Sequence, residues 1–210
     1  MPPSAIIRAA FVEASEYFVA TSSAVPDGHW DRPALGVWSM RDLVGHTSRS
    51  LLTVEAYLAG SAAHVDLHDP TEYFLATLAG MADEAAVAER GRQAGAALGG
   101  DPVQSVRDIA ARVVPLVQRA ADDALVGTPW GGMKLIDYLP TRVFELSIHT
   151  LDLAAALGLQ GDLPEPSSRV TWGLIADLAR RRGVQNDILR ALTGRSGLSP
   201  GFTILAAERT

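Results

Sequence analysis

Cysteine is absent from the 210-residue sequence. The chain therefore has no disulfide, no thiolate ligand for a metal and no cysteine nucleophile. Any chemistry that needs a thiol has to take that thiol from another molecule. The absence of cysteine also fits a reducing compartment, and we expect a cytoplasmic protein.

Basic residues are too few and too scattered to indicate a nucleic-acid-binding protein. Lysine and arginine number 18 against 24 aspartates and glutamates, which gives a formal net charge of −6. An acidic chain without a basic block matches neither nucleic acid nor an anionic membrane surface. No apolar run approaches the roughly 18 residues of a membrane span, and the N-terminus lacks the pattern of a signal peptide. We therefore expect no nucleic-acid and no membrane partner.

Apolar residues recur at helical spacing over most of the chain. Ser39 followed by Asp42 resembles a capping box at the start of the second helix. The segment "VGTPWGGMK", residues 126–134, is expected to be a loop, and residues 202–206 a short strand. The expected helices are 4–22, 38–58, 70–79, 82–98, 102–125, 133–157, 164–183 and a short one near residue 186. The sequence thus predicts a single all-α domain over residues 1–210, a four-helix bundle with short additional helices.

Three ionisable groups interrupt the most hydrophobic helix, in "TRVFELSIHTLDL" (141–153). Glu145 and His149 are four residues apart and share one helix face, and Asp152 continues that stripe. A buried charge is costly unless it is paired or bound to a metal. A structural ion pair between Glu145 and His149 is one explanation, and a metal site is the other.

His46 supplies the third group that a metal site would need. It lies in the second predicted helix, and two helices of a bundle can bring it opposite Glu145 and His149. Two histidines and one carboxylate form a known ligand set of catalytic zinc with an open fourth position. The set also suits iron or nickel. Asp152 would either accept a hydrogen bond from a ligand imidazole or form an ordinary helix salt bridge.

A rival histidine pair lies in the segment "GSAAHVDLHDP", residues 60–70. His64 and His68 are also four residues apart, with Asp66 and Asp69 beside them. The segment lacks an apolar helical face and is bounded by Gly and Pro. We therefore expect these side chains to be exposed to solvent rather than to form the site.

Two histidine-bearing segments and a C-terminal segment point to a family. The segment "VWSMRDLVGH" (37–46) has a W-x7-H pattern, and "RVFELSIHTLDLAAALG" (142–158) has the pattern R-x-x-E-x-x-x-H-x-x-D-L. Both resemble elements of the mycothiol-dependent maleylpyruvate isomerase family, within the DinB-like superfamily. The segment "LTGRSGLSPGFTIL" (192–205) resembles a C-terminal tail of many relatives. The two histidine-bearing elements are specific as a pair, and either one alone is weak.

The resemblance implies a DinB-like four-helix bundle with a metal, usually zinc, at one end of its core. The metal ligands of the family fall on His46, Glu145 and His149. The resemblance further implies mycothiol as a cosubstrate and assembly as a homodimer. The characterised isomerase has a second, C-terminal α/β domain, which we expect this chain to lack. In the isomerase an arginine of the third helical region contributes to substrate binding. No motif fixes its register here, so Arg90 is either its counterpart or an ordinary surface residue.

A metal with an open position would favour the deprotonated form of an external thiol. A thiolate is the reactive nucleophile, so the predicted catalytic group is a metal-bound thiol and no side chain is assigned as nucleophile. The expected cavity walls include Tyr57 and Trp130, together with Trp38 unless its indole only packs as a hydrophobic staple before the helix. Arg142 would either bind a substrate carboxylate or neutralise Glu145.

Three functions therefore remain open from the sequence. The first is a metal-dependent enzyme that uses a low-molecular-weight thiol either to isomerise a small electrophile or to attach the thiol to it through sulfur (S-transfer). The second is a metal-dependent hydrolase on the same bundle, in which water takes the place of the thiol. The third is a non-enzymatic, dimeric helical binding module.

Overall fold

The computed structural model describes residues 2–60, 62–80 and 84–205. Most of these residues are helical, and the strands form two short antiparallel pairs. The helices are α1 (Ser4–Ser23), α2 (Met40–Ala59), α3 (Pro70–Gly80), α4 (Glu84–Ala97), α5 (Pro102–Arg119), α6 (Leu135–Ala156), α7 (Glu165–Arg181) and α8 (Gln185–Leu192). The strands are β1 (Pro33–Leu35), β2 (Trp38–Ser39), β3 (Leu125–Thr128) and β4 (Gly131–Lys134). The predicted all-α fold is confirmed.

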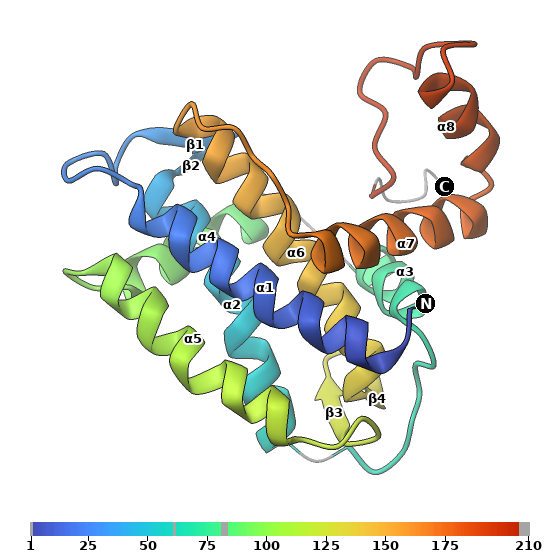
Figure 1. Ribbon diagram of the computed structural model, residues 1–210, viewed down its shortest axis with the longest axis horizontal. Coiled ribbons are helices and arrows are strands. Elements are labelled where there is room, and N and C mark those ends of the chain that lie inside the picture. Colours follow the sequence, from blue (N-terminus) through green and yellow to red (C-terminus); the bar gives the residue numbers. More distant parts are fainter. Residues whose placement is uncertain (1, 61, 81–83, 206–210) are drawn as a thin grey trace.

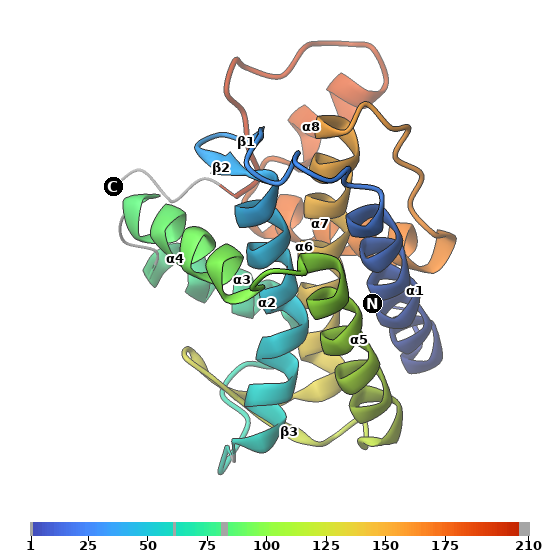
Figure 2. The ribbon, with the colours of Figure 1, turned by 90° about the vertical axis from the view of Figure 1, so that its left-hand side faces the viewer.

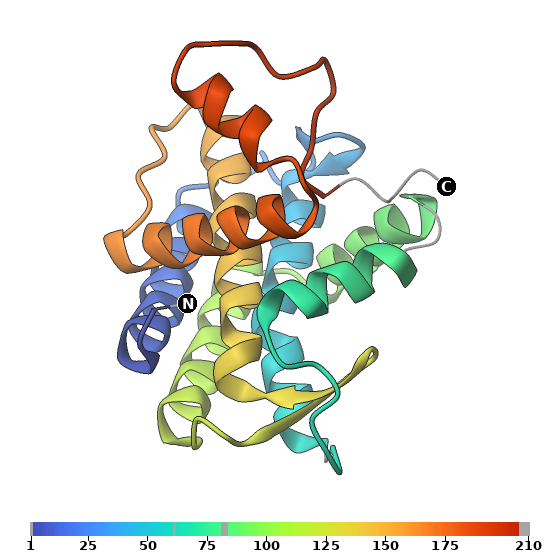
Figure 3. The same ribbon diagram turned by 90° about the vertical axis from the view of Figure 1, so that its right-hand side faces the viewer.

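Helices α1, α2, α5 and α6 form the central bundle (Figure 1). Their facing sides carry large apolar side chains that are fully removed from solvent, among them Phe11, Phe18, Leu51, Val113 and Leu146. Figure 2 shows α3 and α4 on the side of α2 that faces away from α1. Figure 3 shows α7 crossing over α1 and α6. No helix in the described part of the chain is both long and apolar enough to cross a membrane.

The start of α2 is fixed by the predicted capping box. The Asp42 backbone N–H donates to Ser39 Oγ, and the Ser39 backbone N–H donates to Asp42 Oδ2. Trp38 comes directly before this cap, is 8% exposed, and donates from its indole Nε1 to the Ala88 carbonyl of α4 at 3.0 Å. The cap and the indole together set the direction of α2 over the turns that lead to His46.

Glycines allow α4 to pack closely on α2. A methyl group on Gly45 would lie 2.5 Å from the Gly95 Cα, and a methyl group on Gly95 would lie 2.9 Å from the Arg41 carbonyl oxygen. A methyl group on Gly91 would lie 2.5 Å from Cε2 of the Trp38 indole. The two helices therefore meet almost backbone to backbone, one residue before His46.

Three sequence-based predictions differ from the structure at element ends. Residues 126–134 were expected to be a loop, but β3 and β4 form a hairpin there, since the buried side chains of Val126 and Met133 pair across it. The helix expected over 102–125 ends at Arg119, where the backbone becomes extended at Ala120. Residues 202–205 contain no strand, and residue 206 lies outside the described residues.

Candidate metal centre

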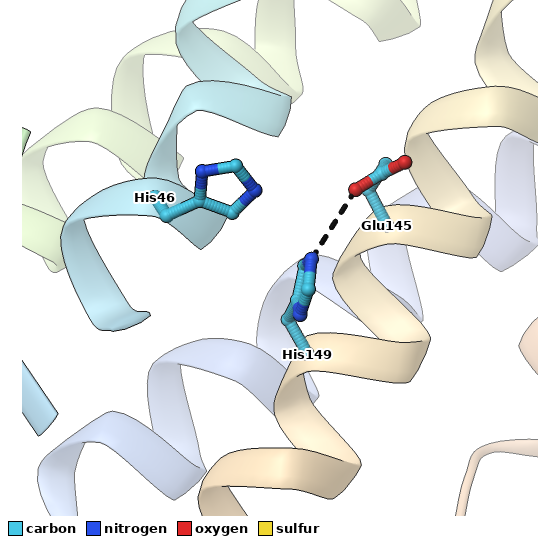
Figure 4. A group of neighbouring side chains, drawn as sticks. All are labelled: His46, Glu145 and His149. Carbon is cyan, nitrogen blue, oxygen red and sulfur yellow. Dashed lines mark ion pairs between the residues drawn. The ribbon is translucent and has the colours of Figure 1, made fainter. Parts of the chain in front are cut away.

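Helices α2 and α6 bring three potential ligands together at one level of the bundle. His46 lies on α2, and Glu145 and His149 lie one turn apart on α6. One ligand atom from each residue lies within 4.8 Å of the others. Figure 4 shows the His46 ring directed toward the space between the two α6 side chains. The ring centroids of His46 and His149 are 5.0 Å apart.

Asp152 orients His149. Nδ1 of His149 lies 3.1 Å from Asp152 Oδ2, while Nε2 lies 3.4 Å from Glu145 Oε2. The hydrogen bond at Nδ1 holds the ring so that Nε2 faces the site, as carboxylates commonly do for metal-binding histidines. The spacing of three residues predicted this contact, because residues i and i+3 are neighbours on a helix.

The Trp38 indole covers one face of the His46 ring. Their centroids are 4.4 Å apart, and Nδ1 of His46 is buried without a hydrogen-bond partner among the described residues. The ring nitrogen that Figure 4 shows facing the site is therefore Nε2. A half-buried imidazole with one nitrogen aimed at a carboxylate and a second imidazole suits coordination through that nitrogen.

Burial and neighbouring charges separate the pKa values of the three groups. Burial, with the nearby His149 charge, lowers the pKa of His46 to about 4. Burial opposes ionisation of Glu145, but the His149 hydrogen bond and charge outweigh it and lower the pKa of Glu145 to about 2. Burial also opposes protonation of His149, but its bonds to Asp152 and Glu145 outweigh it and raise its pKa to about 9. Without a metal, Glu145 and His149 therefore form an ion pair beside a neutral His46.

The donor set fits a divalent cation. Two imidazoles and a carboxylate are the ligand types of catalytic zinc, and iron and nickel accept the same set. Coordination would replace the proton shared by Glu145 and His149, because a metal ligand has to be deprotonated. The metal site and the ion pair, the two explanations left open by the sequence, are thus compatible as the loaded and empty forms of one centre.

A cavity of about 630 Å³ opens beside the three residues. Its walls come from α2, α3, α4 and α6, from the Pro129–Trp130 turn and from Leu205. Four of the residues predicted to lie near substrate line it: Trp38, Arg90, Trp130 and Arg142. Asp152, which was expected behind a ligand or near substrate, does not. Tyr57, another predicted wall, lines it as well. The cavity is large enough for a small organic ligand.

Arg49 and Tyr73 also line the cavity, and neither was predicted from the sequence. Arg49 lies three residues after His46 and therefore on the same side of α2, a spacing that could have identified it. Tyr73 lies on α3, whose placement on α6 no sequence motif indicates. Gly80 makes room for Trp130, because a methyl group there would overlap the indole ring.

Arg142 does not pair with Glu145. No carboxylate in the described part of the chain lies within 4.0 Å of its guanidinium nitrogens, and Nε donates to Thr141 Oγ1 at 3.0 Å. Its guanidinium carbon lies 5.0 Å from the Tyr138 ring centroid and 5.4 Å from that of Tyr73. Its charge still contributes to the low pKa of Glu145, so it acts on that carboxylate from a distance.

The rival histidines are exposed, as predicted. His64 and His68 lie outside the core, and His64 Nε2 is 3.0 Å from Asp66 Oδ1 at the surface. A second hollow of about 530 Å³, between α1 and α5, is lined mainly by small apolar residues and contains no predicted site residue. The chemistry of the chain is therefore concentrated at the α2–α6 cavity.

Comparison with known families gives one match. The sequence model described as the mycothiol maleylpyruvate isomerase N-terminal domain matches residues 11–154. The matched region contains all three candidate ligands and Asp152. Comparison with curated proteins and with solved structures gives no match.

Proposed function

The chain belongs to the mycothiol maleylpyruvate isomerase N-terminal domain family of the DinB-like superfamily, and on this premise we propose that it is a metal-dependent enzyme that uses a low-molecular-weight thiol. The proposed metal is zinc, with nickel or iron as substitutes, and the proposed thiol is mycothiol. The observation that carries the proposal is the His46, Glu145 and His149 cluster at the wall of a ligand-sized cavity. A cytoplasmic location and a homodimer are also proposed.

His46, Glu145 and His149 would hold the metal, and Asp152 would hold His149 in position. A bound divalent metal supplies one chemical effect, a lower pKa of a coordinated thiol, so that the thiolate is present at neutral pH. Trp38 covers His46 and excludes water from that side of the site. The aromatic side chains Tyr57, Tyr73 and Trp130 provide walls against which a small electrophile can lie.

The thiolate is a soft nucleophile that adds to an electron-poor alkene. Addition forms a carbon–sulfur bond and leaves a single bond where the double bond was. Rotation about that bond and loss of the same thiolate return the alkene as its isomer, with no net change in atoms or charge. If the adduct instead takes up a proton, the product is a thioether. The two outcomes are the isomerase and the S-transferase forms of the proposed function.

Thiol loss and alkene isomerisation together test the proposal directly. With mycothiol and the cis isomer of an electron-poor alkene such as 3-benzoylacrylate, purified protein loaded with zinc is expected to accelerate either the loss of mycothiol or the cis–trans isomerisation, and treatment with a chelator should abolish the acceleration. His149→Ala should behave like the chelated protein, because it removes one ligand. His68→Ala, which removes an exposed histidine, is the matched control and should keep the activity. Equal rates with and without chelator would contradict the proposal.

Asp152→Asn should weaken zinc binding by about 10- to 100-fold, the usual effect of removing a carboxylate that orients a metal-binding histidine. The asparagine amide keeps the size of the side chain but is a weaker acceptor for the N–H at His149 Nδ1. Competition with a chromophoric zinc chelator measures the change. Asp177→Asn on α7 removes a surface carboxylate and should have no effect. Unchanged affinity in Asp152→Asn would assign Asp152 to an ordinary helix salt bridge.

A further inference from the structure

The chain after α8 returns to the cavity. We call residues 193–205 the strap. Figure 3 shows it in red, turning back from α8 toward α3 and α4. Leu205, at the end of the strap, lines the same cavity as the three proposed metal ligands. The strap therefore forms part of the cavity wall, although the proposed function gives it no role.

A tight turn directs the end of the strap toward the cavity. The Phe202 backbone N–H donates to the Ser199 carbonyl at 3.0 Å, and Gly201 has a φ of 73°. Proline at the second position, here Pro200, and glycine with positive φ at the third are typical of a type II turn. Because four adjacent residues specify this turn, the strap can keep its shape whether or not it touches the bundle.

The strap is held on the bundle by apolar side chains. Ile204 and Leu205 are half-buried and pack against the core, whereas residues 193–201 are exposed. Within the described part of the chain, every hydrogen bond of the strap goes to α8 or to the strap itself, and none of its residues forms an ion pair. Segments with so few buried contacts are the ones that open most easily.

The base of the strap is also loosely attached. Helix α8 contains no buried residue and packs against α7. Gly194 directly follows this helix with a φ of 73°. Glycine tolerates a wide range of backbone angles, and hinges of mobile segments are often small residues at the end of an element. Gly194 is therefore suited to let the strap change direction without disturbing the bundle.

We propose that the strap is a lid on the cavity. It turns about Gly194 to admit small ligands, and it closes when Ile204 and Leu205 return to the bundle. Closing buries two aliphatic side chains, and opening returns conformational entropy to the exposed residues between them and α8. The closed lid keeps water from the reacting groups, as mobile loops do in many enzymes. This inference rests on the proposed function for what enters the cavity, whereas the opening is a property of the chain alone.

A cysteine placed in the cavity measures the opening, because the chain has no cysteine of its own. Thr77 lines the cavity from α3, so Thr77→Cys puts a thiol behind the lid. In chelator-treated protein, methyl methanethiosulfonate should modify this thiol slowly but completely. Adding I204A and L205A should raise the rate roughly 10- to 100-fold, the factor expected when two partly buried aliphatic side chains lose their contacts.

Two controls accompany the labelling. Leu192→Cys on α8 places the thiol at a position that is 66% exposed, so its rate should be fast and independent of I204A and L205A. Leu198→Ala removes an exposed aliphatic side chain of the strap that does not line the cavity, and it should leave the rate of Thr77→Cys unchanged. A rate for Thr77→Cys equal to that of Leu192→Cys, or no modification at all without I204A and L205A, would overturn the inference. The first result would mean an uncovered cavity, and the second a permanent wall.

A second measurement leaves the cavity side chains untouched and covers the case in which Thr77→Cys does not fold. Spin labels on Thr203→Cys of the strap and Gln118→Cys of α5 occupy two exposed positions. Double electron–electron resonance should give separate closed and open distances, and I204A with L205A should leave mainly the open one. Ala176→Cys on α7, paired with Gln118→Cys, should give one narrow distance throughout. One narrow distance for the strap with and without I204A and L205A would overturn the inference.

Neither measurement needs zinc or mycothiol, so the outcomes separate the lid from the proposed function. A strap that opens in a protein that binds no metal would support the lid and refute the metal-dependent function. A zinc-dependent thiol reaction in a protein whose Thr77→Cys thiol reacts as fast as an exposed one would refute the lid and leave the proposed function standing.

Discussion

Glu145→Gln will bind zinc more than about 100-fold more weakly than the wild type, because loss of a direct ligand should exceed the effect of losing an orienting carboxylate. The substitution keeps the shape of the side chain and removes the charge that pairs with His149. The amide is a poor zinc ligand, so two imidazoles would be left to hold the cation. Competition with a chromophoric chelator at fixed pH gives the affinity, and the thiol-consumption rate should fall with it.

Glu55→Gln is the matched control for that variant. Glu55 lies on α2, is paired with Arg112 at 2.6 Å, and does not line the cavity. The same change of carboxylate to amide there should leave the zinc affinity within about twofold of the wild type, since a surface ion pair contributes little. Equal loss in both variants would indicate a general effect of charge, and unchanged affinity in Glu145→Gln would remove Glu145 from the ligand set.

Gly45→Ala will lower the free energy of unfolding by about 3 kcal/mol, at the upper end of the usual range for overpacking a tight contact. The added methyl group would lie 2.5 Å from the Gly95 Cα, and neither backbone can move aside without separating α4 from α2. Because Gly45 directly precedes His46, the displacement should also weaken metal binding. Chemical denaturation followed by circular dichroism measures the stability.

Gly173→Ala is the matched control, because the same change of glycine to alanine should not lower the stability there. Gly173 lies inside α7, and nothing within 4 Å would meet an added methyl group. Alanine is favoured over glycine inside a helix by about 1 kcal/mol, so this variant should be equally or more stable than the wild type. Equal stability changes in the two variants would show that the close α2–α4 approach is not important for the fold.

The sequence predicted those parts of the site that depend on spacing along one helix. Glu145, His149 and Asp152 lie on one face of α6 because residues three and four apart are neighbours there. The capping box at Ser39 was equally readable, since it depends on Ser39 and Asp42 alone. To predict that His46 lies opposite α6, the spacing along one helix was not enough. That prediction combined two helix patterns with the bundle fold and the resemblance to a family.

Features that depend on contacts between distant segments could not be read in the same way. The hairpin at 125–134 forms because Val126 and Met133 are both buried, whereas its glycine-rich sequence alone indicates a loop. Tyr73 and Arg49 become cavity residues only when α3 and α2 are placed around α6. Arg142 was expected either to neutralise Glu145 or to bind substrate. That it forms no ion pair with any described residue became visible only with the side chains in place.

The close packing of α2 on α4 connects the fold to the proposed chemistry. The Trp38 indole donates a hydrogen bond to the Ala88 carbonyl on α4 and covers the His46 ring on α2. The position of α4 therefore affects both the cavity wall and a proposed ligand. A change at this crossing should therefore alter stability and metal binding together. A change on the distant face of α7 should alter stability alone.

Metal content is the most direct test of the account. Protein purified after expression in metal-replete medium should contain about one zinc, nickel or iron per chain by elemental analysis, as expected for a single three-ligand centre. His46→Ala should lose that metal while keeping its helical content. A wild-type protein free of metal under these conditions would contradict the account and would leave Glu145 and His149 as a structural ion pair in a helical binding module.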